Sequence, residues 1–130
     1  MPLAQTSRAP HTLALSPCTA AGSEVAIDAR DCAPALLRSQ PHLAALFDEI
    51  IADLDLRPIG QLWHVFPEPG GVTGLVLLTE SHLTVHTFPE SGHAIFNLYC
   101  CRPRLEWPWD ARLRLTLGAR QVRIRSCPRG

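Results

Sequence analysis

The strongest constraint on the fold is a series of short segments in which apolar and polar residues alternate. In the segment EVAIDARDC, which starts at Glu24, the apolar residues Val25, Ile27 and Ala29 alternate with charged ones. Strand-like runs also occupy residues 59–68, 71–82, 93–101 and 121–127, and residues 83–88 continue extended. A period of two is typical of a strand with one buried face. The chain is therefore expected to form a sheet of several short strands.

One stretch of the sequence has the periodicity of a helix. Between residues 41 and 54 the apolar residues recur at steps of three and four, which predicts a helix with one apolar stripe. Pro41 fits the first turn of this helix, where its missing N–H costs nothing. Residues 112–119 are ambiguous, because they alternate like a strand while Asp110 and Gly118 could begin and end a short helix.

The order of these elements predicts the fold class. A strand, a helix, three or four strands, a possible helix and a last strand indicate an α+β fold. We expect a two-layer sandwich, with helices packed on one face of an antiparallel sheet. A chain of 130 residues has the length of one domain, and we assign that domain to residues 23–130. Residues 1–22 are expected to be a flexible N-terminal extension, because they offer little apolar surface to bury.

Composition excludes several classes of protein. The 12 basic and 12 acidic residues give a formal charge of zero, and no basic stripe points to nucleic acid. The apolar stretch at residues 13–15 is too short for a secretory signal or a membrane span. The five cysteines form no CxxC pair, which argues against a zinc ribbon or a disulfide framework. Reduced thiols in a cytoplasmic protein fit this pattern.

The polar residues of most interest lie in the stretch LLTESHLTVHTFPES. Glu80, Ser81 and His82 stand in a row, and His86 follows within a β-branched run. His82 and His86 share one face of a strand, but this spacing is a strong zinc cue only on a helix, so no metal is predicted. The G-x-S-x-G turn of serine hydrolases is absent. The alternative is a surface strand with one face in solvent, which would account for each serine or histidine of this stretch taken on its own.

Taken as a whole, LLTESHLTVHTFPESG closely resembles the signature of the prokaryotic S-adenosylmethionine decarboxylase proenzymes. The similarity covers about sixteen contiguous positions, which is far more specific than a short motif. It extends to AIDARDC, HVFPEPGGVTG and LGARQVRIRSCPRG, and so to most of the chain after residue 23. The resemblance also favours a helix over a strand for residues 110–117.

The resemblance implies a pyruvoyl-dependent enzyme that cleaves its own chain between Glu80 and Ser81. Ser81 Oγ would attack the carbonyl of Glu80 and convert the amide into an ester. A base, which is His86 by resemblance, would then remove the Ser81 α-proton. Elimination and hydrolysis would leave a pyruvoyl group derived from Ser81, on the fragment 81–130. The hydroxyl of Thr73 would support this processing, although the family usually has serine there.

The resemblance also implies the residues that act during turnover. The pyruvoyl carbonyl would form a Schiff base with the substrate amine and accept the electrons released by decarboxylation. The family places its proton donor twenty positions after the serine, which falls on Cys101 rather than on its neighbour Cys100. Phe66 lies where an aromatic ring stacks on adenine, and Glu90 where a carboxylate binds the ribose hydroxyls.

The expected function is therefore to make decarboxylated S-adenosylmethionine for spermidine biosynthesis. The expected assembly is a homodimer of cleaved two-chain protomers in the cytoplasm, with no nucleic acid, membrane or metal partner. The chain departs from the family pattern at Asn97, Ser91 and His93, and it lacks the glycine that usually follows Cys101. These departures fall mainly on residues that could shape the substrate pocket.

Two alternatives therefore stay open. One is the same pyruvoyl chemistry acting on arginine or ornithine, which the presence of Phe66 and Glu90 disfavours. The other is a non-catalytic homologue that binds or regulates a partner, which the intact Ser81, His86 and Cys101 disfavour.

Overall fold

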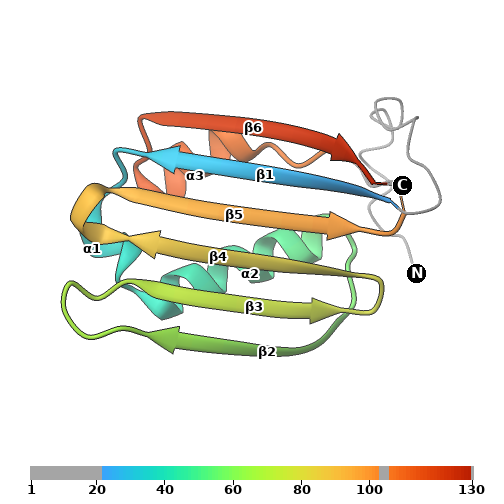
Figure 1. Ribbon diagram of the computed structural model, residues 1–130, viewed down its shortest axis with the longest axis horizontal. Helices are drawn as coiled ribbons and strands as arrows, with labels where there is room; N and C mark the ends of the chain where they lie inside the picture. Colours follow the sequence, from blue (N-terminus) through green and yellow to red (C-terminus); the bar gives the residue numbers. More distant parts are fainter. Residues whose placement is uncertain (1–21, 103–105, 130) are drawn as a thin grey trace.

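The computed structural model describes residues 22–102 and 106–129. Its strands are β1 (Ser23–Arg30), β2 (Pro58–Val65), β3 (Val72–Leu78), β4 (Ser81–Phe88), β5 (His93–Cys100) and β6 (Gln121–Pro128). Its helices are α1 (Pro34–Leu37), α2 (Gln40–Asp53) and α3 (Trp109–Leu117), with a short 3-10 turn, η2 (Pro89–Ser91), between β4 and β5 (Figure 1). Residues 1–21 of the expected N-terminal extension lie outside the described residues.

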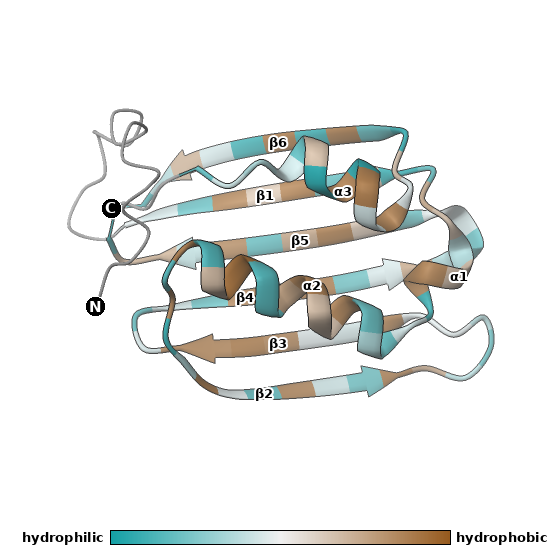
Figure 2. Ribbon diagram, turned by 180° about the vertical axis from the view of Figure 1, so that it is seen from behind, coloured by the Kyte–Doolittle hydropathy of each residue, from teal (hydrophilic) through white to brown (hydrophobic). Residues whose placement is uncertain are grey.

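The six strands form one sheet in the order β2-β3-β4-β5-β1-β6, and every neighbouring pair is antiparallel. Helices α2 and α3 lie across one face of this sheet (Figure 2), and the described residues leave the other face open (Figure 1). The fold is thus an α+β two-layer sandwich, as the sequence predicts. No helix in the described part of the chain is long and apolar enough to cross a membrane.

The core lies between the sheet and the helices, where the apolar stripe of α2 meets the inward residues of the strands. Ser39 caps α2, because its side chain accepts a hydrogen bond from the His42 N–H at 3.2 Å. Phe47 of α2 contacts the rings of Trp63 on β2 and Phe96 on β5 at centroid distances of 5.3 and 6.3 Å. These contacts fix α2 against strands that lie far apart in the sequence.

The ambiguous segment near residue 113 is a helix, as the family resemblance favours. Trp109, Leu113 and Leu117 are buried at steps of four, whereas Leu115 between them is 71% exposed. Gly118 ends α3 with a φ of 71°, a conformation that glycine adopts without strain. Arg112 of α3 also pairs with Glu49 of α2 at 2.7 Å, which links the two helices.

The predicted strand over residues 71–82 is wrong in one respect. The chain turns back at Thr79 and Glu80, so β3 ends at Leu78 and Ser81 begins the antiparallel strand β4. The turn contains none of the glycine, proline, asparagine or aspartate residues that usually signal one. The expected cleavage position therefore lies at the junction between a tight turn and a strand.

Thr87 ties the end of β4 to the rest of the domain. Its buried hydroxyl donates to the Leu37 carbonyl at 2.8 Å and accepts from the Val72 N–H at 2.9 Å. The hydroxyl thus joins α1, β3 and β4 in a part of the core that water does not reach. This threonine of the signature HTFPE has a structural role in the described chain.

Candidate active site

The residues around the expected cleavage position lie at one end of the sheet. We call Glu80, Ser81, Cys101 and Arg102 the cleavage cluster. The Cys101 N–H donates to the Glu80 carbonyl oxygen at 3.1 Å, and Ser81 is paired in register with Cys100 of β5. Ser81 is only 8% exposed. Two segments about twenty residues apart in the sequence are thereby held side by side.

The two adjacent cysteines occupy different environments. Cys100 is the last residue of β5 and is buried in the core, whereas Cys101 follows the strand and is exposed. The Cys101 thiol donates to the Tyr99 hydroxyl at 3.7 Å, and this hydrogen bond is the largest cause that raises the pKa of Tyr99. The ring of Tyr99 stacks on His82 at a centroid distance of 5.6 Å.

A second group of predicted residues lies on the open face of the sheet. Thr73 of β3 and His86 of β4 are paired in register, and Thr73 Oγ1 lies 3.0 Å from His86 Nδ1. The tautomer of the imidazole sets the direction of this hydrogen bond. We call these two residues the histidine cluster. The Thr73 hydroxyl thereby holds the His86 ring in one orientation, as a side chain that acts as a base requires.

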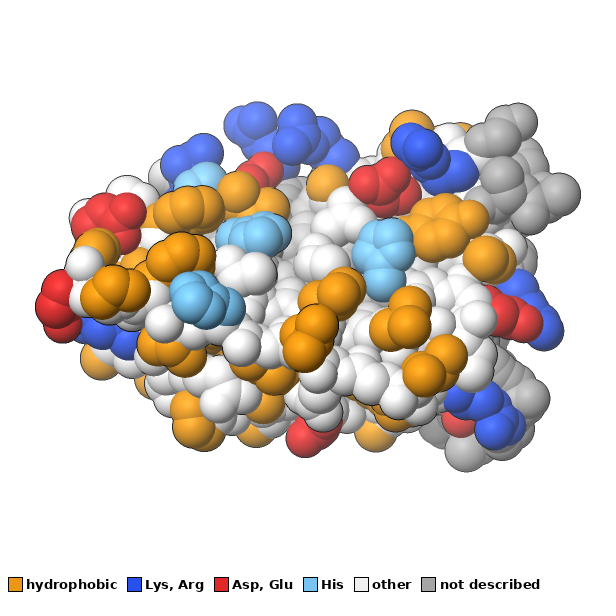
Figure 3. All heavy atoms as spheres, turned by 60° about the horizontal axis from the view of Figure 1, so that its bottom comes forward, with side chains coloured by type: hydrophobic (Ala, Val, Ile, Leu, Met, Phe, Trp, Pro, Cys, Tyr) orange, Lys and Arg blue, Asp and Glu red, His pale blue; other side chains and the backbone are white. Residues whose placement is uncertain are grey.

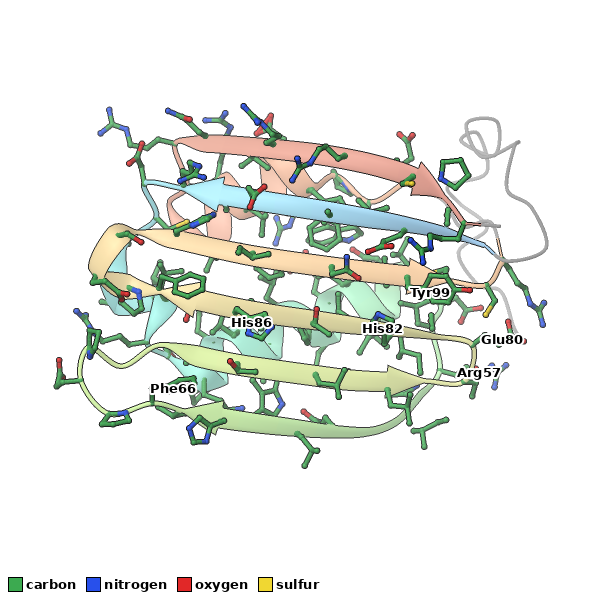
Figure 4. The ribbon with its side chains drawn as sticks, viewed as in Figure 1. Arg57, Phe66, Glu80, His82, His86 and Tyr99 are labelled. Atoms are coloured by element: carbon green, nitrogen blue, oxygen red, sulfur yellow. The ribbon has the colours of Figure 1, made fainter. Side chains whose placement is uncertain are left out.

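The residues expected to bind substrate lie toward the same end of the sheet as the histidine cluster. Phe66 follows β2, is 48% exposed and contacts the His64 ring edge-on at 4.5 Å. Glu90 is exposed and lies in the η2 turn that directly follows β4. Figure 4 shows Phe66 and His86 toward one end of the sheet, and Glu80 and Tyr99 at the other.

The structure therefore does not bring all the predicted site residues together within one chain. Ser81 and His86 are five residues apart on β4, which corresponds to about 16 Å at the usual rise of a strand. Because five is an odd number, the two side chains also point to opposite faces of the sheet. The burial pattern agrees, since Ser81 is buried on the helix side and His86 is exposed on the open side.

The open face also carries apolar side chains in contact with solvent. Figure 3 shows apolar and histidine side chains on the side of the molecule where the β2 edge comes forward. The large apolar residues exposed on or beside this face are Leu62 (74%), Leu75 (37%), Leu77 (50%), Phe66 (48%) and Phe88 (37%). Several exposed apolar side chains on one face favour an interaction surface there.

Sequence reasoning missed several residues near the cleavage position. Arg102 Nε lies 2.5 Å from Glu80 Oε1, and Arg102 Nη2 donates to Glu80 Oε2 at 2.6 Å. No spacing rule in the sequence connects these two residues, because both lie in irregular segments. The stacking of Tyr99 on His82 could have been expected only once the register of β4 and β5 was known. Within the described residues no three His, Cys, Asp or Glu side chains are grouped to hold a metal ion.

Comparison with known proteins places this architecture in a family. The family model for S-adenosylmethionine decarboxylase matches residues 23–130. The S-adenosylmethionine decarboxylase proenzyme 1 of Bacillus cereus is 36% identical over 87 residues, which are 65% of this chain and 65% of that protein. The matched part thus spans slightly less than two thirds of that relative. The proenzyme of Symbiobacterium thermophilum is 34% identical over 111 residues, which are 84% of this chain and 83% of that protein.

A solved structure agrees with the fold. The crystal structure of the adenosylmethionine decarboxylase from Aquifex aeolicus superimposes with a TM-score of 0.69 at 22% sequence identity. The match covers 87% of this chain and 93% of that one. Because the family model spans nearly all of the described domain, the chain belongs to the S-adenosylmethionine decarboxylase family.

Proposed function

We propose that this protein is a pyruvoyl-dependent S-adenosylmethionine decarboxylase that cleaves itself between Glu80 and Ser81. The observation that carries the proposal is the geometry of the cleavage position. The Glu80 carbonyl accepts a hydrogen bond from the Cys101 N–H at 3.1 Å, and Ser81 follows it at the start of β4. A donor on this oxygen polarises the carbonyl that the serine must attack. The product would be decarboxylated S-adenosylmethionine, made in the cytoplasm for spermidine biosynthesis.

Self-cleavage needs a nucleophile, an oxyanion donor and a base. Ser81 Oγ bonds to the Glu80 carbonyl carbon, the Glu80–Ser81 C–N bond breaks, and the hydroxyl proton ends on the released amine of Ser81. The Cys101 N–H holds the oxygen that becomes negative. His86, oriented by Thr73, then removes the Ser81 α-proton, so that the Oγ–Cβ bond breaks. The fragment that ends at Glu80 leaves as a carboxylate, and hydrolysis of the remaining dehydroalanine releases ammonia.

The residues around Ser81 fit a pyruvoyl group at that position. Ser81 is nearly buried, and the residue before it is held by the backbone N–H of Cys101, whose thiol is exposed at the same end of the sheet. The pyruvoyl group supplies an electrophilic carbonyl that accepts the electron pair released as carbon dioxide leaves. We assign the return of a proton to the substrate carbon to Cys101. Phe66 and Glu90 are assigned to the adenine ring and the ribose hydroxyls.

We further propose that two copies of the chain complete each site. Within one chain the cleavage cluster and the histidine cluster lie toward opposite ends of β4 and on opposite faces. In a two-fold symmetric dimer that packs open face against open face, with its axis running across the strands, the histidine cluster of one copy would lie over the cleavage end of the other. Symmetry repeats this arrangement at a second site. The exposed leucines of β2 and β3 would be buried in the same contact.

Intact mass of the purified protein under denaturing conditions tests self-cleavage, with Ser81→Ala as the uncleaved control. We expect two fragments, which end at Glu80 and begin at residue 81. The second fragment should weigh less than a serine-started peptide by one ammonia and should resist Edman sequencing. A wild-type chain of full mass after long incubation would contradict the proposal and favour a non-catalytic homologue.

The substrate requires a separate measurement. Release of labelled carbon dioxide from S-adenosylmethionine, arginine and ornithine should be compared on the cleaved protein, and we expect release from S-adenosylmethionine alone. Release from arginine or ornithine would leave the pyruvoyl chemistry intact and overturn the substrate assignment. Phe66→Ala should raise KM for S-adenosylmethionine while self-cleavage remains complete, because this ring is assigned to substrate and not to processing.

A further inference from the structure

The cleavage cluster contains an ion pair that neither self-cleavage nor turnover, as described above, makes use of. The Arg102 guanidinium faces the Glu80 carboxylate with Nε at 2.5 Å from Oε1 and Nη2 at 2.6 Å from Oε2. The Nη2 hydrogen bond and the Nε ion-pair contact together restrict the orientation of both groups, because the guanidinium is rigid and planar. The residue held in this way supplies the carbonyl of the scissile bond.

Glu80 is therefore held at two points. Its carbonyl oxygen is bound by the Cys101 N–H, and its carboxylate is bound by the next residue along the same segment. Rotation of the Glu80–Ser81 peptide would break one or both of these contacts. An intramolecular attack depends strongly on orientation, since small displacements from the reactive geometry slow such reactions by large factors.

The exposure of the pair argues against a mainly structural role. The side chains of Arg102 and Glu80 are 58% and 34% exposed. Ion pairs in contact with solvent contribute little to folding stability. A pair that adds little to stability but binds the residue before the nucleophile is better placed to influence the rate of cleavage than the fold.

We propose that Arg102 is a positioning residue for self-cleavage, which holds Glu80 so that its carbonyl stays on the Cys101 N–H while Ser81 attacks. This inference rests on the proposed self-cleavage. The step it assists is an isomerisation, in which the Ser81 Oγ–C bond forms and the C–N bond breaks within one chain. No co-reactant is needed, and Arg102 exchanges no proton.

The experiment follows the cleavage of freshly purified proenzyme by intact mass over time. Arg102→Ala should slow cleavage about tenfold relative to wild type, and Arg102→Lys should lie between them because it keeps the charge without the planar guanidinium. Arg57→Ala is the matched control. Arg57 carries the same charge at the same end of the sheet (Figure 4), and its described hydrogen bond uses its backbone carbonyl, which accepts from the Thr79 N–H. Arg57→Ala should cleave at the wild-type rate.

Chemical rescue separates positioning from a structural effect. Millimolar guanidinium chloride should restore several-fold of the lost rate in Arg102→Ala, whereas equal concentrations of sodium chloride or urea should not. Thermal unfolding should show that Arg102→Ala keeps its fold. An equal loss of rate in Arg57→Ala, or cleavage of Arg102→Ala at the wild-type rate, would overturn this inference alone. A wild-type chain that is never cut would overturn the proposed function as well.

Discussion

Cys100 and Cys101 are neighbours in the chain, but their surroundings predict different consequences of substitution. Cys101 is exposed beside the cleavage position, and Cys100 is 5% exposed within the core. Cys101→Ala should leave a cleaved protein whose kcat falls about 100-fold or more, because it removes the group proposed as the proton donor. Cys100→Ala should keep kcat and lose about 1 kcal/mol of stability. Steady-state kinetics and urea unfolding of the two cleaved variants check this, and equal kcat values would refute the assignment.

The burial of the Cys32 thiol leads us to predict that the folded protein loses stability at high pH. Burial, assisted by the charge of Asp31, raises the pKa of the Cys32 thiol from 9.0 to about 11. The folded protein therefore keeps this proton in a range where the unfolded chain has lost it. The stability that this thiol contributes is complete below pH 9 and is lost as the pH rises toward 11, by roughly 3 kcal/mol at most.

The measurement is urea unfolding of Ser81→Ala, which keeps one intact chain, at several values between pH 8 and pH 11. All 12 basic residues are arginine, so no lysine titrates in this window. Adding Cys32→Ala should flatten the decline in the free energy of unfolding. An equally steep decline in both variants would show that the thiol does not govern it.

At the scale of the elements, the edge strand β2 depends on the absence of a side chain at one position of β3. Gly74 is paired in register with Trp63, whose ring packs on Phe47 of α2. A Cβ atom at Gly74 would overlap the Trp63 ring, whereas one at Gly60 would meet nothing within 4 Å. Gly74→Ala should therefore cost about 1 to 3 kcal/mol, and Gly60→Ala less than about 0.5 kcal/mol.

Urea unfolding of the two alanine variants in the Ser81→Ala background gives the comparison. Loss of near-ultraviolet circular dichroism of tryptophan in Gly74→Ala but not in Gly60→Ala would show that tryptophan packing is disturbed, and Trp63 is the tryptophan that an added Cβ at Gly74 would meet. Equal stabilities of the two variants would show that β2 moves away from β3 without cost, and that the packing of Trp63 on Phe47 does not hold the edge strand.

How far the sequence predicts the elements depends on whether the signal is local. The alternation of β1, β5 and β6 and the stripe of α2 predict these elements to within about one or two residues. In α3 the leucines at 113, 115 and 117 alternate like a strand, yet the spacing of four that buries Leu113 and Leu117 is also helical. The local pattern alone cannot decide between a strand and a helix, whereas the family resemblance favours the helix.

The parts of the site that could not be predicted depend on contacts between distant segments. The turn at Thr79 and Glu80 contains none of the residues that usually form turns, so the sequence does not indicate where β4 begins. Once that start is known, the odd spacing of Ser81 and His86 puts them on opposite faces. The pairing of Arg102 with Glu80 needed the antiparallel register of β4 and β5, which no local pattern contains.

At the scale of the whole molecule, the separation of Ser81 from His86 raises the question of whether two copies of the chain must assemble to form one site. One chain presents His86, the proposed base, on the open face and Ser81, the proposed nucleophile, at the far end of the same strand. If His86 of one copy acts on Ser81 of the other, a Ser81→Ala chain can supply the base that a His86→Ala chain lacks. A mixed dimer of Ser81→Ala and His86→Ala would then contain one complete site.

The prediction is tested by co-expressing the two variants with different tags and recording the intact mass of each chain. Each variant alone should yield no pyruvoyl fragment. With random mixing of equal amounts, about half of the His86→Ala chains should be cut, because about half pair with a Ser81→Ala partner. A doubly substituted Ser81→Ala/His86→Ala chain should give no rescue. Neither should Leu62→Glu, which puts a charge on an exposed leucine of the proposed interface. If mixing produces no cleavage although the mixed dimer forms, the base acts within its own chain, and β4 must rearrange before Ser81 and His86 can meet.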